Sequence, residues 1–194
     1  MAGMAISGAV RSIMGAGSQT ADAISQGQGS DAGAQAGGAP SGASRALSVA
    51  LDVAGKVWNL PNTIIGLGVG AVTLAADIVQ STILTAFTGR NHFQNIGISF
   101  GNNAIQIRTG LDLPGQTDGG LTLGNTIIYN NSSPNQNITS PYTGLTVNLG
   151  RHERAHTYQG QKLGPLYLPA MIKNGVASPN NKYERQADYQ SIVR

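Results

Sequence analysis

The sequence contains no cysteine among its 194 residues, which excludes a disulfide framework, a thiolate metal site and a cysteine nucleophile. Charged residues make up only 11 % of the chain and aromatic residues 5 %. These low fractions exclude a charge-rich disordered protein and a coiled coil. No basic run interleaves with aromatic residues, so we expect no nucleic-acid partner. The length suits one domain, with or without a loose arm.

The charge that is present lies unevenly along the chain. Residues 151–194 hold seven of the 12 Lys and Arg residues and three acids, a net charge of +4, whereas the first 150 residues carry −1. This excess is either scattered solubilising charge or a patch for an anionic partner.

Residues 1–45 are expected to form a flexible arm, because residues 15–44 are almost entirely Gly, Ala, Ser and Gln and offer little apolar surface to bury. Residues 1–14 are mildly apolar but lack a basic start, so we recognise no cleavable signal peptide. The arm, or a short helix within it, is suited to docking on a carrier.

Residues 46–89 are expected to be helical. Apolar residues recur at three- and four-residue spacings up to Leu60, and Pro61 should end that helix near Asn59. Residues 63–87 then form a nearly continuous apolar stretch, long enough to span a bilayer. Asp77 and several glycines disfavour insertion. We expect a buried or partner-facing helix, with membrane contact through residues 63–87 as the alternative.

Residues 90–194 combine strand and helix signals. Short β-prone runs at residues 96–100, 104–107, 121–123 and 126–129 are paired around Gly- and Asn-containing turns. Residues 130–142 form a polar loop. Helical segments follow, one ending at Gly164-Pro165 and the last starting at Ser178-Pro179. We therefore predict an α+β fold, with a short antiparallel sheet packed on a pair of helices.

The strongest chemical signal is the motif H-E-x-x-H formed by His152, Glu153 and His156. On a helix, positions i and i+4 share a face, so the two imidazoles can bind one metal ion, here expected to be Zn²⁺. Glu153 can then act as general base toward a water molecule beside the metal. The chain has only three histidines and two glutamates, so this concentration favours a site over chance. The remaining histidine, His92, has no partner in sequence.

The second glutamate of the chain supplies a third ligand. Glu184 and Asp188 lie four residues apart on the expected last helix, and a catalytic zinc site needs three protein ligands. Glu184 can complete the set, while Asp188 accepts the N–H of a ligand histidine and fixes its tautomer.

H-E-x-x-H followed by a helix with E-x-x-x-D resembles the gluzincins, the thermolysin-like zinc metallopeptidases. The resemblance implies that His152, His156 and Glu184 bind zinc, that Glu153 is the general base and that Asp188 orients a histidine. The string from His152 to Pro169 also resembles small bacterial H-E-x-x-H domains, some of which occur in secreted toxins and effectors. The resemblance covers residues 91–194. It implies a minimal zincin-like catalytic domain at residues 90–194.

A peptidase also needs a donor for the oxyanion that develops on the scissile carbonyl. Spacing does not distinguish four candidate tyrosines: Tyr158, Tyr167, Tyr183 and Tyr189. We assign the role to Tyr183. Residues 121–129 are the candidate sheet edge to which a peptide substrate would add.

Three functional interpretations follow. The first is a zinc metallopeptidase that acts on protein or peptide substrates as a bacterial effector or toxin, secreted or delivered into a target cell or its periplasm. A secretion-system carrier and a cognate inhibitor protein would be its partners. The second is a zinc hydrolase of cell-wall peptides. The third is a membrane-active, pore-forming toxin in which the metal site is structural.

Overall fold

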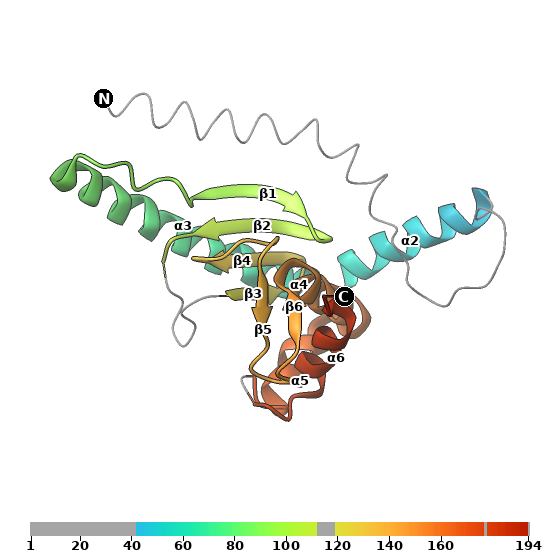
Figure 1. Ribbon diagram of the computed structural model, residues 1–194. Helices are drawn as coiled ribbons and strands as arrows, with labels where there is room; N and C mark the ends of the chain where they lie inside the picture. Colours follow the sequence, from blue (N-terminus) through green and yellow to red (C-terminus); the bar gives the residue numbers. More distant parts are fainter. Residues whose placement is uncertain (1–41, 112–118, 177, 194) are drawn as a thin grey trace.

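The computed structural model describes residues 42–111, 119–176 and 178–193 and has a mixed α+β fold (Figure 1). The flexible arm expected at residues 1–45 lies outside the described residues except for its last four positions, which belong to helix α2 (Gly42–Trp58). Helix α3 (Leu60–Thr88) follows after Asn59. The break falls where Pro61 predicts it, because proline fits the first turn of a helix and not its interior.

The main sheet has four strands in the order β1-β2-β4-β3. Its strands are β1 (Gly97–Gly101), β2 (Ala104–Thr109), β3 (Gly119–Leu123) and β4 (Thr126–Asn130). The two expected hairpins are present, with Asn102, Asn103 and Gly124 at positive φ in their turns.

The prediction of a purely antiparallel sheet is wrong, because β2 and β4 pair in parallel. Each hairpin contributes its more apolar strand to the centre of the sheet, so that Ile107 lies beside Ile128. The strands β1 and β3 become the edges. The polar loop expected at residues 130–142 contains β5 (Asn137–Thr139), which pairs with β6 (Thr146–Asn148) in a small second sheet.

The main sheet lies between two layers. Ile107 and Ile128 point to one face and pack with Val69 and Leu74 of α3. Ile127 and Tyr129, on the opposite face, pack with Leu149 at the start of helix α4 (Leu149–Leu163). Because side chains alternate along a strand, α3 and α4 are held on opposite faces of the sheet.

The C-terminal helices cover the α4 side. After α4 come a 3₁₀ turn at Gly164–Leu166, helix α5 (Tyr167–Lys173) and helix α6 (Lys182–Ser191), which packs on α4 (Figure 1). Helix α4 ends at Gly164 as predicted. The last helix does not begin at Ser178-Pro179: residues 178–181 form a turn, and the amide side chain of Asn181 caps the helix instead.

Candidate metal centre

The residues of H-E-x-x-H lie in the first two turns of α4. The side chain of Asn148 accepts the backbone N–H of Arg151 at 3.0 Å and so fixes where the helix begins. His152, Glu153 and His156 are all buried. The two imidazoles follow one another along one face of the helix, as the spacing of four residues predicts.

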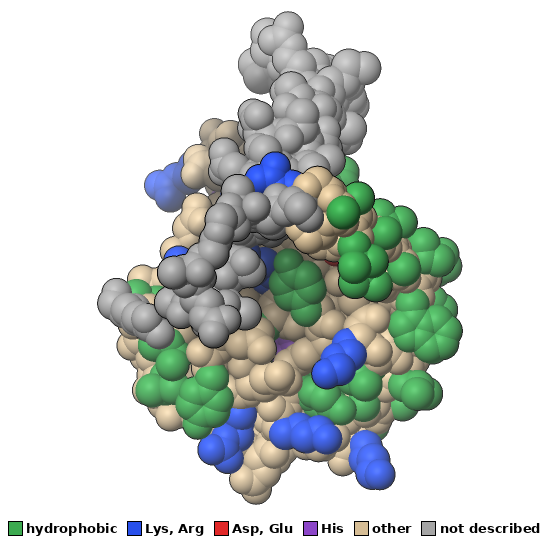
Figure 2. All heavy atoms as spheres, turned by 90° about the vertical axis from the view of Figure 1, so that its right-hand side faces the viewer, with side chains coloured by type: hydrophobic (Ala, Val, Ile, Leu, Met, Phe, Trp, Pro, Cys, Tyr) green, Lys and Arg blue, Asp and Glu red, His purple; other side chains and the backbone are tan. Residues whose placement is uncertain are grey.

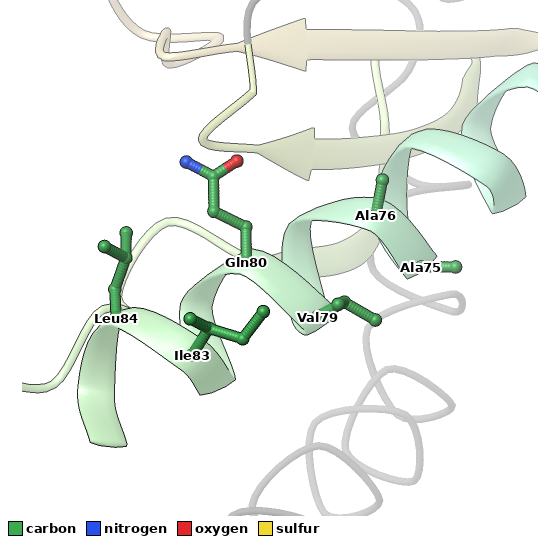
Figure 3. A pocket seen from close by; sticks show the side chains of 6 residues that line it. All are labelled: Ala75, Ala76, Val79, Gln80, Ile83 and Leu84. Atoms are coloured by element: carbon green, nitrogen blue, oxygen red, sulfur yellow. The ribbon is translucent and has the colours of Figure 1, made fainter. Parts of the chain in front are cut away.

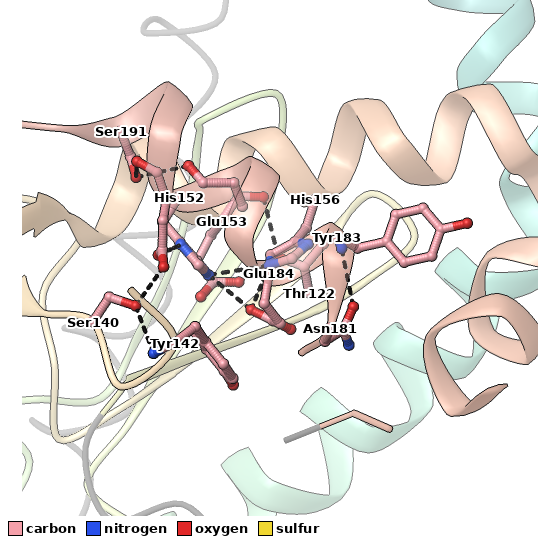
Figure 4. Close-up of polar contacts among 12 residues, drawn as sticks. Thr122, Ser140, Tyr142, His152, Glu153, His156, Asn181, Tyr183, Glu184 and Ser191 are labelled. Atoms are coloured by element: carbon pink, nitrogen blue, oxygen red, sulfur yellow. Dashed lines mark hydrogen bonds and ion pairs between the residues drawn. The ribbon is translucent and has the colours of Figure 1, made fainter. Parts of the chain in front are cut away.

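Helix α6 brings the distant carboxylates to the same place. Asn181 caps it by accepting the N–H of Tyr183 at 3.0 Å, and Glu184 and Asp188 lie on the buried side that faces α4. The carboxylate of Glu184 lies 3.2 Å from Nε2 of each histidine (Figure 4), and the carboxylate of Asp188 lies 2.9 Å from Nδ1 of His152. The structure therefore brings together all four residues that the sequence predicts as ligands or as support for a ligand.

Three donor atoms form a compact triangle. The Nε2 atoms of His152 and His156 are 3.1 Å apart, and each lies 3.2 Å from Oε2 of Glu184. A tetrahedral ion with bonds of about 2.0–2.1 Å keeps its ligand atoms about 3.3 Å apart. The spacing of this group fits a small cation held by all three residues, so His152, His156 and Glu184 could hold a metal ion.

The contacts of the other nitrogen of each imidazole bear on how the two rings could bind a cation. Nδ1 of His152 lies 2.9 Å from Asp188 Oδ1, and Nδ1 of His156 lies 2.9 Å from Oε1 of Gln159. Both partners are acceptors, so each Nδ1 carries a proton and each Nε2 of a neutral ring presents a lone pair. With both rings neutral, two lone pairs and a carboxylate oxygen point at one spot, which a metal ion can occupy and which a proton on one ring occupies in its absence.

The pKa values of His152 and Glu184 are both shifted in the direction that favours a positive charge at this position. Burial acts to lower the pKa of His152, but hydrogen bonds to Asp188 and Glu184 and the charge of Glu153 raise it to about 10. Burial acts to raise the pKa of Glu184, but its contacts with the two histidines lower it to about 2. The site thus holds its carboxylates ionised and binds a proton tightly, as a cation site does.

Asp188 is itself held in place. Burial acts to raise its pKa, but hydrogen bonds from His152 and from the hydroxyls of Ser140 and Thr143 lower it. Ser140 and Thr143 belong to the loop between β5 and β6. The ring of His156 is fixed similarly, because Gln159 also donates from its amide to the backbone carbonyl of Tyr183 at 3.0 Å. Sequence reasoning missed these supports. Gln159, three residues after a ligand histidine, is the one that helical spacing could have indicated.

Glu153 is held on the strand side of the group. The hydroxyl of Thr122 in β3 lies 2.6 Å from its carboxylate oxygen Oε2. Its side chain passes directly over Gly120, where an added Cβ would lie 2.6 Å from the carboxylate carbon. The edge strand β3 therefore both orients this carboxylate and leaves it room.

Tyr183 does not join the group. Its ring points away from the histidines (Figure 4), and the ammonium of Lys182 lies 5.0 Å from the ring centroid. Tyr158 and Tyr189 are exposed and Tyr167 is buried. Instead, the loop that carries Ser140 and Thr143 places Tyr142, half-buried, beside Glu184 (Figure 4). Burial and the negative charges of Glu184, Glu153 and Asp188 raise the pKa of Tyr142, so its phenol stays protonated at neutral pH.

His92 also lies apart from the group. It follows α3, and its Nε2 is 3.0 Å from the hydroxyl of Thr88. The described residues hold no second cluster of three metal-binding side chains. On the face of the molecule that Figure 2 shows, a small area of histidine surface lies in a hollow.

Comparisons of the chain with protein-family models, with curated proteins and with solved structures found no match. The function is therefore inferred from the arrangement of these side chains.

Proposed function

We propose that this protein is a zinc-dependent metallopeptidase of the gluzincin type. The observation that carries the proposal is the triangle formed by His152, His156 and Glu184, with Glu153 buried next to it on the same helix. Two histidines and a glutamate are the ligand set of a catalytic zinc site that keeps one position open. The pairing of a motif helix with a second helix that supplies a carboxylate supports a zincin-like arrangement.

The number of ligands favours a catalytic site over a structural one. A structural zinc site is closed by four protein ligands, whereas the described part of the chain gathers three. His92, the remaining histidine, bonds to Thr88 in a different part of the fold. A fourth position open to water and substrate is what hydrolysis requires.

Glu153 would move the proton in the reaction. A zinc ion, when bound, acidifies water and polarises the substrate carbonyl. The carboxylate of Glu153 accepts a proton as water adds to the carbonyl carbon, and returns it to the amine as the C–N bond breaks. The hydroxyl of Thr122 holds one carboxylate oxygen and leaves the other to receive that proton.

Tyr142 is the best-placed donor for the oxyanion, in place of Tyr183. It lies in the loop between β5 and β6. The hydroxyls of Ser140 and Thr143 in this loop donate hydrogen bonds to the carboxylate of Asp188. Its raised pKa keeps the O–H available to donate. A positioned donor of this kind stabilises charge that appears only in the transition state.

Strand β3 is the candidate docking edge for the peptide. Its last three residues fall within residues 121–129, it is at the end of the order β1-β2-β4-β3 among the described strands, and it packs against α4. An extended peptide can add to such an edge through main-chain hydrogen bonds. Both protein substrates and cell-wall peptides meet this requirement.

The proposal is tested with the full-length chain loaded with zinc and offered quenched fluorescent peptides and purified cell-wall peptides. We expect Glu153→Gln to retain stoichiometric zinc and to lose cleavage by about a thousandfold or more, because the amide cannot accept the proton. Asp52→Asn, the same chemical change at an ion pair on α2, is the matched control and should retain both properties. Undiminished cleavage by Glu153→Gln would exclude this mechanism.

A further inference from the structure

Helix α3 turns a largely polar side inward, with Val69 and Leu74 partly buried on the sheet. The residues that it buries against the rest of the protein are all polar or glycine: Asn62, Thr63, Gly66, Gly70, Asp77 and Ser81. Its large apolar side chains are mostly exposed, and the helix is long and apolar enough to cross a membrane, with 28 % of its most apolar stretch buried. A core helix of a soluble domain shows the opposite arrangement.

The inward face is fixed to the sheet. The carboxylate of Asp77 accepts hydrogen bonds from the backbone N–H of Gly110, from Thr109 and from Ser81. Gly70 lies so close to Ile107 that a side chain there would collide with it. The helix cannot rotate its apolar face inward without breaking these contacts, so that face stays outward.

The outward face is long and uncharged. It follows a helix of 29 residues, or about 43 Å at ~1.5 Å per residue. Asp77 is the only charged residue of α3, and it is 4 % exposed. Val72 is 70 % exposed and Phe87 84 %. In Figure 3, Val79 and Ile83 lie on the side turned away from the strands, along a shallow apolar groove. A continuous apolar surface of this kind indicates an interaction site.

A lipid surface fits this face better than another protein does. A protein interface ordinarily includes charged groups at its rim, whereas the exposed polar side chains of α3 are uncharged: Gln80, Thr82 and Thr88. Trp58 at one end and Phe87 with the exposed Arg90 at the other are residues typical of the membrane interface. Arg90 lies two residues beyond the end of α3, and the helix exposes no acidic side chain, so the charge along this face favours anionic lipids.

We infer that the outward face of α3 docks flat on an anionic bilayer, and that the helix lies on the membrane and does not span it. Spanning would remove Asp77 from its hydrogen bonds with the sheet. Because α4 packs on the opposite face of the sheet, the metal centre would lie on the side away from the lipid. This inference does not depend on the proposed peptidase activity.

Vesicle flotation with the full-length chain tests the docking. We expect binding to vesicles of phosphatidylcholine with phosphatidylglycerol, and a loss of about tenfold or more in the double variant Val72→Glu/Val79→Glu. Tyr189→Glu, an exposed apolar residue on α6, is the matched control and should bind as the unaltered protein does. Unchanged zinc content and circular dichroism in the double variant establish that it is folded.

Trp58 is the single tryptophan of the chain and the last residue of α2, so its fluorescence reports how deep the start of α3 lies. Lipids brominated near the headgroup should quench its fluorescence more than lipids brominated near the chain ends. Absence of vesicle binding by the unaltered protein would overturn the inference. So would quenching from the bilayer centre with dye release, which indicates spanning, or a dimer that the double variant dissociates without any vesicle binding, which indicates a second copy as the partner.

Discussion

Helices α3 and α4 both bury polar side chains on the sheet, from opposite faces, but the two sets of buried groups differ in kind. On α3, the carboxylate of Asp77 finds N–H and O–H donors supplied by the chain itself. On α4, the Nε2 atoms of His152 and His156 and a carboxylate oxygen of Glu184 converge within 3.2 Å of one another, an arrangement that could hold a metal ion. A buried polar group that is satisfied internally holds a fold together, whereas converging acceptors indicate a ligand.

The largest effect is expected when the carboxylate of Glu184 is removed from the group on α4. Glu184→Ala should abolish stoichiometric zinc binding, measured by elemental analysis after gel filtration, because it removes one of three ligands. Chelation of the unaltered protein should lower its melting temperature, since binding to the folded state stabilises it. His92→Ala removes a histidine outside the group and should keep full zinc content. Stoichiometric zinc in Glu184→Ala would contradict the ligand assignment.

The corresponding change on α3 should affect stability and leave the metal site intact. Asp77→Ala leaves the N–H of Gly110 and the hydroxyl of Thr109 without their acceptor, and we expect a loss of about 3–5 kcal/mol in the free energy of unfolding. Urea denaturation measures it. Thr82→Ala removes an exposed hydroxyl from the same helix and should cost less than about 0.5 kcal/mol. Loss of zinc from folded Asp77→Ala would show that the two faces are not independent.

A smaller effect should come from the loop that supports the metal centre. Tyr142→Phe should lower kcat by about a hundredfold through loss of one oxyanion donor, with zinc content unchanged. Tyr183→Phe is the matched control, because that ring points away from the centre (Figure 4), and should cleave at the normal rate. If the two variants exchanged these outcomes, the role would return to Tyr183.

The smallest expected effect is the pH dependence of the metal-free protein. The pKa of Glu184 is lowered from 4.5 to about 2, so its contribution to stability is present above pH 4.5 and is lost as pH falls toward 2. The pKa of His152 is raised from 6.5 to about 10, so its contribution is present below pH 6.5 and is lost as pH rises toward 10.

The melting temperature of the protein in chelator should therefore be highest between pH 4.5 and pH 6.5, where both contributions are present. Zinc should remove the alkaline decline, because the metal takes the place of the proton. An alkaline decline of equal size with zinc bound would contradict this explanation.

Local features of the fold could be predicted from the sequence more reliably than its long-range pairings. Pro61 marks the boundary between α2 and α3, and Gly164 ends α4, because each acts on its own backbone. The parallel pairing of β2 with β4 joins two hairpins that are separated in the chain, and nothing local encodes it. Which face of α3 is buried could not be predicted either, because the composition of the helix does not show which face the sheet will cover.

The residues of the candidate site also differ in how far they could be predicted from the sequence. His152, Glu153 and His156 follow from helical spacing, and Glu184 and Asp188 follow from the scarcity of other ligands. Tyr142 lies in a loop whose path depends on hydrogen bonds to Asp188, across 45 residues or more. Such a residue can be found only when the fold is known.

Gly160 lies inside α4, the helix that carries His152 and His156, and lets α4 pack closely against residues that precede residue 90. A Cβ at Gly160 would lie 2.5 Å from the side-chain nitrogen of Asn59, and Gly164 similarly makes room for the indole of Trp58. Both partners precede residue 90, where the sequence suggests that the catalytic unit begins. A fragment of residues 90–194 would keep His152, His156 and Glu184 but would expose the C-terminal end of α4, which Asn59 and Trp58 contact. The smallest self-sufficient unit around the metal centre therefore extends back at least to Trp58.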